Sequence, residues 1–294
     1  MRMKIPACSA LLSILLCLAC AGAALAADDP VGTAAVMDLG MGARALGMGG
    51  AHIAVAEDAS TVYYNPAGLA LIDGRSVTSM YTNQFGAVGY LSLGYAQKNV
   101  GIGLLTLNAS GIEQTDEFAD VTGVFGMTDM TIMAAYGRTV IDNLSVGGTL
   151  KYYSQTMPES SGKGITGDVG VLYRLADGKV SAGAVARNVL GSVKYSGGAT
   201  DAFDRSWGVG IAIRPMRALL IAADAVIGEG FSARAGAEYR LGLVALRAGA
   251  ASGSGQTSMT AGAGFALANF KIDYAYQTHS VLPDSHKLSL GMRF

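Results

Sequence analysis

Alternation of apolar and polar side chains with a period of two runs through most of the chain and constrains the fold more than any other feature. In 270–277 (FKIDYAYQ), Phe, Ile and both Tyr share one face, and Lys, Asp, Ala and Gln share the other. The segments 231–241 (FSARAGAEYRL) and 207–214 (WGVGIAIR) repeat the pattern. Successive side chains of a strand point to opposite faces, so the pattern predicts half-buried β-strands.

The overall composition narrows the kinds of β-protein that fit. Charged residues make up 15% of the 294-residue chain, against roughly 25% in soluble domains. Beyond the N-terminus, however, no run of about 20 apolar residues would form a membrane-spanning helix. An exported β-sandwich would turn the apolar strand faces to a core, whereas a membrane barrel would turn them to lipid.

Three features favour the barrel. The polar strand faces carry small residues and isolated charges, which suits a crowded lumen, and tyrosines such as Tyr152 and Tyr239 lie near strand ends. The chain ends in HKLSLGMRF, an amphipathic strand that closes on Phe294, as expected of a barrel handled by the barrel-assembly machinery. We therefore predict an all-β fold, a 14-stranded antiparallel transmembrane β-barrel in the bacterial outer membrane.

Fourteen alternating segments give this strand number, and an even number is usual for such barrels. They lie near residues 75–83, 86–97, 99–109, 128–139, 142–155, 165–175, 179–190, 205–214, 217–227, 231–241, 242–251, 256–267, 269–278 and 285–294. The connections after every second strand are brief and the others are mostly longer, the largest being 110–127. Short periplasmic turns and longer outer loops are typical of this class.

The N-terminus has the pattern of a secretory signal, 1–26, with a basic start, an apolar core and an Ala-Leu-Ala cleavage site before Ala27. Lipoprotein processing at Cys20 is the alternative. Cys8, Cys17 and Cys20 all fall inside this signal, so the mature chain cannot depend on disulfides.

Residues 27–73 precede the first strand of the predicted barrel, 74–294, and are too apolar and glycine-rich for an exposed tail. In EDASTVYYNPAGLALI (57–72), Asp58 or Ser60 can cap a short helix that Asn-Pro then ends. A barrel of fourteen strands encloses more space than its own side chains fill. We expect 27–73 to form a hatch, or plug, inside the lumen. The candidate hatch or gate residues are Asp58, Tyr63, Asn65, Pro66, Ala67 and Gly68.

Three runs carry a family resemblance: GARALGMGG (42–50), AVAEDAS (54–60) and YYNPAGLA (63–70). In this order they resemble the N-terminal hatch of the FadL-type (OMPP1/FadL/TodX) outer-membrane transporters, and still more that of their shorter relatives, the PorV/PorQ family. The Arg187-Asn188-x-x-Gly191 element is similar to a mid-barrel motif of the second group. The resemblance implies a fourteen-stranded barrel with an internal hatch.

The resemblance leaves two functions open. FadL-type members pass hydrophobic molecules across the outer membrane, and PorV-type members serve type IX secretion as shuttles or supports of the translocon. The leading expectation is passive transport of hydrophobic small molecules, and the alternative is an accessory protein in secretion or assembly. The expected partners are outer-membrane lipid and either a hydrophobic small molecule or a secreted protein.

Charged side chains on the polar strand faces are expected to point into the lumen. As a ladder of ion pairs they would hold the wall and the hatch together, and as a polar conduit they would line a path. The representative set is Arg234, Glu238, Arg240, Lys271 and Asp273.

Nucleotide binding, metal binding, catalysis and nucleic-acid binding have little support in the sequence. The run GMGARA (40–45) mimics a dinucleotide fingerprint but has no βαβ unit around it. The three histidines lack metal-ligand spacing, and Asp284-Ser285-His286 would point to alternating sides of a strand. Removing the signal leaves 19 basic and 22 acidic residues, which gives no reason to expect nucleic acid. We expect no catalysis, no metal and no cofactor.

Overall fold

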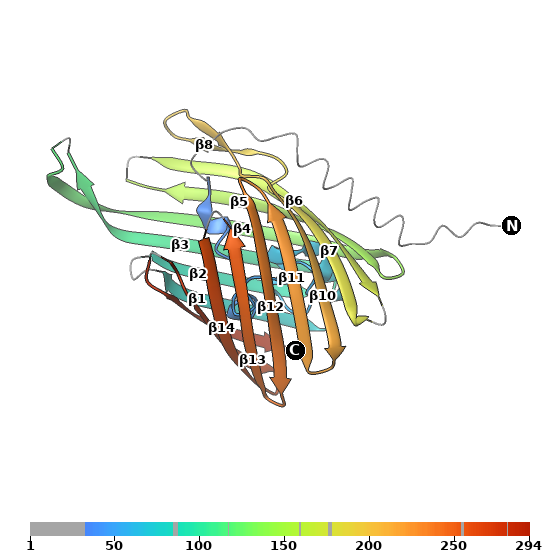
Figure 1. Ribbon diagram of the computed structural model, residues 1–294. Helices are drawn as coiled ribbons and strands as arrows, with labels where there is room; N and C mark the ends of the chain where they lie inside the picture. The colour runs from blue at the N-terminus through green and yellow to red at the C-terminus, as the bar shows by residue number, and fades with distance from the viewer. Residues whose placement is uncertain are drawn as a thin grey trace.

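A computed structural model of the chain describes residues 33–84, 88–116, 118–158, 160–175, 178–253, 256–280 and 282–294. Fourteen antiparallel strands close into a barrel, which confirms the predicted fold class (Figure 1). The expected signal sequence and the residues up to 32 lie outside the described part. Within the described part, no helix is long and apolar enough to cross a membrane.

The barrel wall consists of β1 to β7 and β10 to β16, and β8 and β9 form a small hairpin beside β6. The strand bounds are β1 (Arg75–Gln84), β2 (Val88–Gln97), β3 (Val100–Thr115), β4 (Val121–Ile141), β5 (Leu144–Thr156), β6 (Ser161–Leu175), β7 (Val180–Arg187), β8 (Ser192–Tyr195), β9 (Thr200–Ala202), β10 (Ser206–Met216), β11 (Leu219–Ile227), β12 (Phe231–Leu241), β13 (Val244–Gly253), β14 (Gln256–Leu267), β15 (Phe270–Gln277) and β16 (Ser285–Arg293).

The first and last strands of the chain close the barrel. β1 pairs with β2 on one side and with β16 on the other, with Tyr81 opposite Leu288. Sequential neighbours pair around the rest of the wall, except that β7 pairs with β10. The chain therefore begins its first strand and ends its last at the same rim, because Arg75 and Phe294 exchange backbone hydrogen bonds there.

Burial along the strands shows which face is which. On β15, Phe270 is 63% exposed and Ile272 49%, whereas Asp273 is buried. On β16, Leu290 is 55% exposed and Lys287 only 2%. The apolar face thus points outward and the charged face inward, as a membrane barrel requires and a sandwich does not.

The two ends of the barrel differ in their connections. At the end where the chain terminates, β2–β3, β4–β5, β10–β11, β12–β13 and β14–β15 are joined by two-residue turns. Asn99 and Asn143 have φ of 71° and 69° in two of these turns, as tight hairpins demand. We call this rim the short-turn end and the opposite rim the long-loop end.

Two predicted segments were wrong. Residues 110–127 are mostly a hairpin extension of β3 and β4, which projects from the barrel in Figure 1, rather than a loop. The register shifts between Ala109 and Ile112, with Gly111 at φ 76°, and this bulge breaks the alternation in the sequence. The predicted strand 179–190 ends at Arg187, because Asn188 turns the chain away with φ 53°.

The protein core lies inside the barrel, between the wall and the N-terminal segment, by which we mean residues 33–73. This segment holds η2 (Ala35–Met37), α2 (Ala43–Leu46), α3 (Thr61–Tyr64) and η3 (Pro66–Leu71). Met41, Tyr64 and Leu69 of the segment pack with Tyr90 and Leu105 of the wall in one buried cluster. The blue segment in Figure 1 lies among the strands accordingly.

Candidate functional site

The N-terminal segment contacts the wall on several sides of the lumen. The 3-10 helix η3 packs against β3, β4, β5 and β6, and α2 packs against β14, β15 and β16. Between them, Asp224 on β11 accepts hydrogen bonds at 2.7 and 3.0 Å from the backbone N–H groups of His52 and Ile53. The segment therefore crosses the lumen and is attached at widely spaced strands.

Asn65 and Pro66 lie between two short helices of the segment, and the Asn65 side chain makes several hydrogen bonds there. The helix α3 ends at Tyr64, and Asn65 is extended (φ −161°, ψ 105°) before Pro66 starts η3 at its first position. The Asn65 amide nitrogen donates to the Ile53 carbonyl at 3.0 Å and to the Val171 carbonyl of β6 at 3.1 Å. Its side-chain oxygen accepts from the Ala67 N–H at 3.2 Å. One side chain thus ties two parts of the segment to the wall.

Glycines of the wall face the segment and let it come close. We call them the glycine belt: Gly137, Gly147, Gly170 and Gly183 face Asn65 or Pro66, and Gly208 and Gly210 face Ile53. A Cβ on Gly147 would lie 2.5 Å from the Pro66 carbonyl carbon, and one on Gly170 would lie 2.2 Å from the Asn65 side-chain oxygen. Any side chain here would displace the segment, so the belt explains why glycine occupies these strand positions.

Arg44 forms the centre of a buried ion-pair network. Its guanidinium group lies 2.5 Å from Glu57, 3.3 Å from Asp58 and 2.8 Å from Glu238 of β12. The Arg44 side chain is 6% exposed. Burial by itself would raise the pKa of Asp58, but Arg44, His52 and the hydrogen bonds from Ser60 together outweigh it and lower that pKa to about 2. Arg44, Arg214 and Arg240 together likewise outweigh burial and hold the pKa of Glu57 well below its usual range. All three carboxylates are therefore held as anions.

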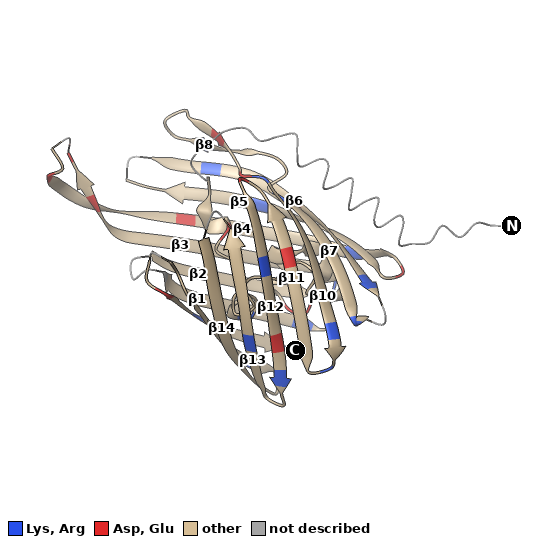
Figure 2. Cartoon of the chain, in the orientation of Figure 1, with Lys and Arg blue, Asp and Glu red and all other residues tan. Residues whose placement is uncertain are grey.

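The network extends from the segment to the strand ends at the short-turn end. Glu57 also pairs with Arg214 and, at 3.0 Å, with Arg240. Arg240 reaches Glu238 at 2.8 Å as well. In Figure 2, Lys and Arg are seen on several strand ends near the C-terminus. Glu57 is thus the point at which the segment is fixed to this rim.

The sequence-predicted hatch residues all lie in the segment. Tyr63 is buried, donates to the Met37 carbonyl at 2.7 Å and accepts from the Gly40 N–H at 3.2 Å. Ala67 is fully buried, and a Cβ on Gly68 would lie 2.5 Å from the Ala56 methyl group. Asp58 bonds Ser60 and Arg44. These residues hold the segment in shape, and the structure does not test whether they form a gate.

The predicted lumen charges fall into two places. Glu238 and Arg240 join the Arg44 network, and Asp273 pairs with Arg247 at 2.8 Å beside it. Arg234 lies apart, toward the long-loop end, where its side chain passes Gly50. Sequence reasoning did not name Arg44 as a site residue. A lone Arg in the apolar run 42–50 was the available signal for it.

Two polar cavities lie on opposite sides of the segment. The first, about 220 Å³, is toward the long-loop end and includes Asp38, Tyr64, Arg234 and Lys287 in its lining. The second, about 240 Å³, opens at the short-turn end beside Glu57. Residues of the N-terminal segment line both cavities.

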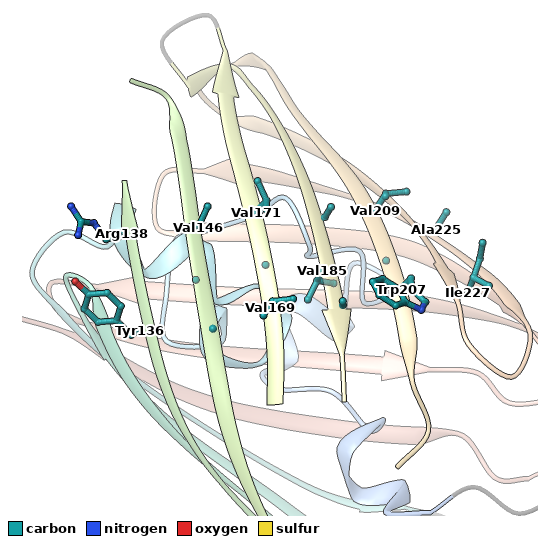
Figure 3. Close-up of a pocket in the computed structure, with 16 residues that line it drawn as sticks. Tyr136, Arg138, Val146, Val169, Val171, Val185, Trp207, Val209, Ala225 and Ile227 are labelled. Atoms are coloured by element: carbon teal, nitrogen blue, oxygen red, sulfur yellow. The ribbon is translucent and has the colours of Figure 1, made fainter. Parts of the chain in front are cut away.

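An apolar hollow of about 650 Å³ lies on the outside of the barrel (Figure 3). Two outward rows of residues on β4 to β11 form this outer groove, with Tyr136 and Ile227 at opposite ends of one row and Trp207 next to Ile227. Val169 and Val209 are 54% and 40% exposed in it. Four glycines of the belt lie between these rows, Gly137, Gly147, Gly170 and Gly208, and Pro66 lies on the inner side of the first three. The groove is therefore the outer face of the wall where it approaches the segment.

Other ligand chemistry has little support in the described part of the chain. No group of three or more His, Cys, Asp or Glu is placed to hold a metal ion there. Asp284 and His286 do not combine with Ser285 into one site, because Ser285 is buried and His286 is exposed.

These features define a closed fourteen-stranded antiparallel barrel whose lumen contains an N-terminal segment of the same chain. Its fold is similar to that of the Pseudomonas putida toluene transporter TodX, with a TM-score of 0.60 at 15% identity over 86% of this chain and 96% of that one. A FadL homologue of Pseudomonas aeruginosa gives 0.58 at 12% identity, covering 83% and 96%.

A deltaS2S3 mutant of the TodX monoaromatic hydrocarbon channel gives a TM-score of 0.61 at 15% identity, covering 87% of this chain and all of that one. No family model and no curated protein matches the chain. The fold is thus the one shared by FadL and TodX channels, and the likeness to the PorV/PorQ family stays a prediction.

Proposed function

We propose that this protein is an outer-membrane barrel through which hydrophobic small molecules diffuse passively, with the N-terminal segment as its gate. The observation that carries the proposal is a closed barrel of the FadL and TodX fold, filled by a segment that lines two cavities. A barrel without an energy source can only let a solute move down its own gradient.

The way the segment is held supports a gate rather than a permanent stopper. Apart from the chain that continues from residue 73 into β1, its attachments in the described residues are hydrogen bonds and ion pairs, such as those of Asn65, Arg44 and Asp224. Polar contacts of this kind can be exchanged for water when a segment shifts. The outer groove adds an apolar surface where a membrane-dissolved molecule can gather next to the same segment.

Locking the segment tests this function. The Ser289 hydroxyl accepts a hydrogen bond from the Ala43 N–H at 2.7 Å, so α2 touches β16 there. The variant Ala43→Cys with Ser289→Cys would join them by a disulfide in a mature chain that is expected to hold no other cysteine. Uptake of labelled toluene is measured in cells of a Gram-negative host, with each single variant as a control.

We expect the wild type to increase uptake over the empty vector. The oxidised double variant should lose this increase and regain it after mild reduction, while both single variants keep it. Equal uptake in the oxidised and reduced double variant would contradict a gate. No uptake by the wild type, together with co-purifying secreted proteins, would favour the secretion accessory instead.

A further inference from the structure

The cavity at the short-turn end carries more positive than negative charge. Four cations and two carboxylates line it, an excess of two positive charges: Arg174, Arg240, Lys271, Arg293, Glu57 and Asp73. They come from β6, β12, β15 and β16 and from the N-terminal segment. We call it the short-turn cavity.

Three of these cations have no carboxylate partner among the described residues. The Arg174 side chain donates only to the Ala56 carbonyl, at 3.4 Å, and the Arg293 side chain donates only to the backbone carbonyl of Glu57. Lys271 has no hydrogen-bond or ion-pair partner there, and Lys271 and Arg174 are both half-buried. Arg214 and Arg240 share the Glu57 carboxylate, so it has little capacity left for the others.

Such a group of cations needs a counter-charge. Partly buried like charges repel one another more strongly than charges in bulk water, because the local dielectric constant is lower. Glu238 and Asp58 do not supply this charge, since they are engaged by Arg44 and its neighbours. The chain thus leaves an open polar cavity with unmatched cations on several of its sides.

We propose that the short-turn cavity binds a doubly charged oxyanion of the phosphate class. Two negative charges match the excess of two positive charges, and a tetrahedral anion offers oxygens in several directions to Arg174, Lys271 and Arg293 together. Guanidinium groups bind phosphate oxygens through charge-assisted and often paired hydrogen bonds. A single carboxylate has one charge and a planar shape, so it would leave part of the cavity unmatched.

The position of the cavity gives the bound anion a structural effect. Its lining includes Ala56 and Glu57 and also Leu71 to Asp73, where the N-terminal segment passes into β1. An oxyanion there would connect four wall strands to both of these parts of the segment. Binding should therefore stabilise the segment in its described position. This inference goes beyond the proposed transport function and does not depend on it.

Calorimetric titration of the detergent-purified mature chain with inorganic phosphate tests the site. Acetate and chloride at matched ionic strength are the comparison anions, and the melting temperature is recorded in each. We expect a single saturable phosphate site. Of the three anions, only phosphate should raise the melting temperature. Lys271→Gln and Arg174→Gln should each weaken binding by about tenfold, because each removes a charged donor.

Arg217→Gln is the matched control, since Arg217 lies in a turn at the same rim and does not line the cavity. A second titration with short-chain phosphatidic acid identifies the source of the anion: tighter binding than inorganic phosphate means a lipid headgroup, and equal binding means free phosphate. Either result supports the proposal. It is overturned if acetate binds as well as phosphate, if neither phosphate compound binds, or if Arg217→Gln weakens binding as much as Lys271→Gln.

Discussion

Replacing Gly147 by alanine tests how closely the barrel wall holds the N-terminal segment. The new Cβ would lie 2.5 Å from the Pro66 carbonyl carbon and 2.6 Å from the Ala67 nitrogen, whereas 3.4–4 Å is an ordinary contact. The segment or the strand must therefore move by about 1 Å, and overpacking of this kind costs about 1–3 kcal/mol. At about 2 kcal/mol, the population with an opened segment rises roughly thirtyfold.

The neighbouring Gly148 provides the control. It faces outward, and its nearest neighbour to an added Cβ is the Asp168 carbonyl oxygen at 3.4 Å. In both Gly147→Ala and Gly148→Ala the residue loses less backbone entropy on folding, which stabilises a strand by about 0.5–1 kcal/mol. The difference between the two variants therefore isolates the contact with Pro66.

Hydrogen exchange followed by mass spectrometry is the assay, with the barrel in detergent and peptides covering residues 61–72. We expect exchange of these peptides to increase in Gly147→Ala and to stay near the wild-type rate in Gly148→Ala, while the strand peptides of both exchange slowly. If residues 61–72 exchange at equal rates in the two variants, the claim that the wall packs directly on the segment is refuted.

Three further outcomes follow from the site. Burial lowers the pKa of His52 to about 4 from 6.5, so its contribution to stability is complete above about pH 6.5 and is lost as the pH falls toward 4. Exchange protection of the segment should fall over this window in the wild type and change less in His52→Phe. Arg44→Met leaves the Asp58 carboxylate without its ion-pair partner and should destabilise the segment by about 3–5 kcal/mol, and adding Asp58→Asn should restore part of the loss in the same exchange assay. Trp207, the single tryptophan, lies in the outer groove, so brominated acyl chains should quench its fluorescence and aqueous iodide should not; the reverse would place the groove away from lipid.

The architecture of the wall was predictable because the alternation of apolar and polar side chains can be read within each strand by itself. On β15 and β16 the apolar residues of the sequence are the exposed ones in the structure, and Asp273 and Lys287 are buried as their positions implied. Prediction failed where the backbone departs from a regular strand. The bulge at Gly111 and the turn at Asn188 each depend on one residue with positive φ. A single residue of this kind produces no periodic pattern in the sequence.

The site was less predictable because its contacts join residues far apart in the sequence. Asn65 and Pro66 stood out as a local break in a helix, but their partner Gly170 lies on a strand more than a hundred residues later. Arg44 meets Glu238 across a separation of 194 residues. Pairing of this kind follows only from the register of the closed barrel, so no local pattern in the sequence indicates it.

At the glycine belt the wall is one backbone thick and carries no side chain on its inner surface. In a membrane, acyl chains in the outer groove and the Asn-Pro element inside would therefore be neighbours across a single peptide layer. Lateral pressure in the bilayer would bear on that layer and reach the segment without any relay of side chains. Bilayer thickness and lipid composition would then be physical variables of the lumen, as much as any molecule that enters it.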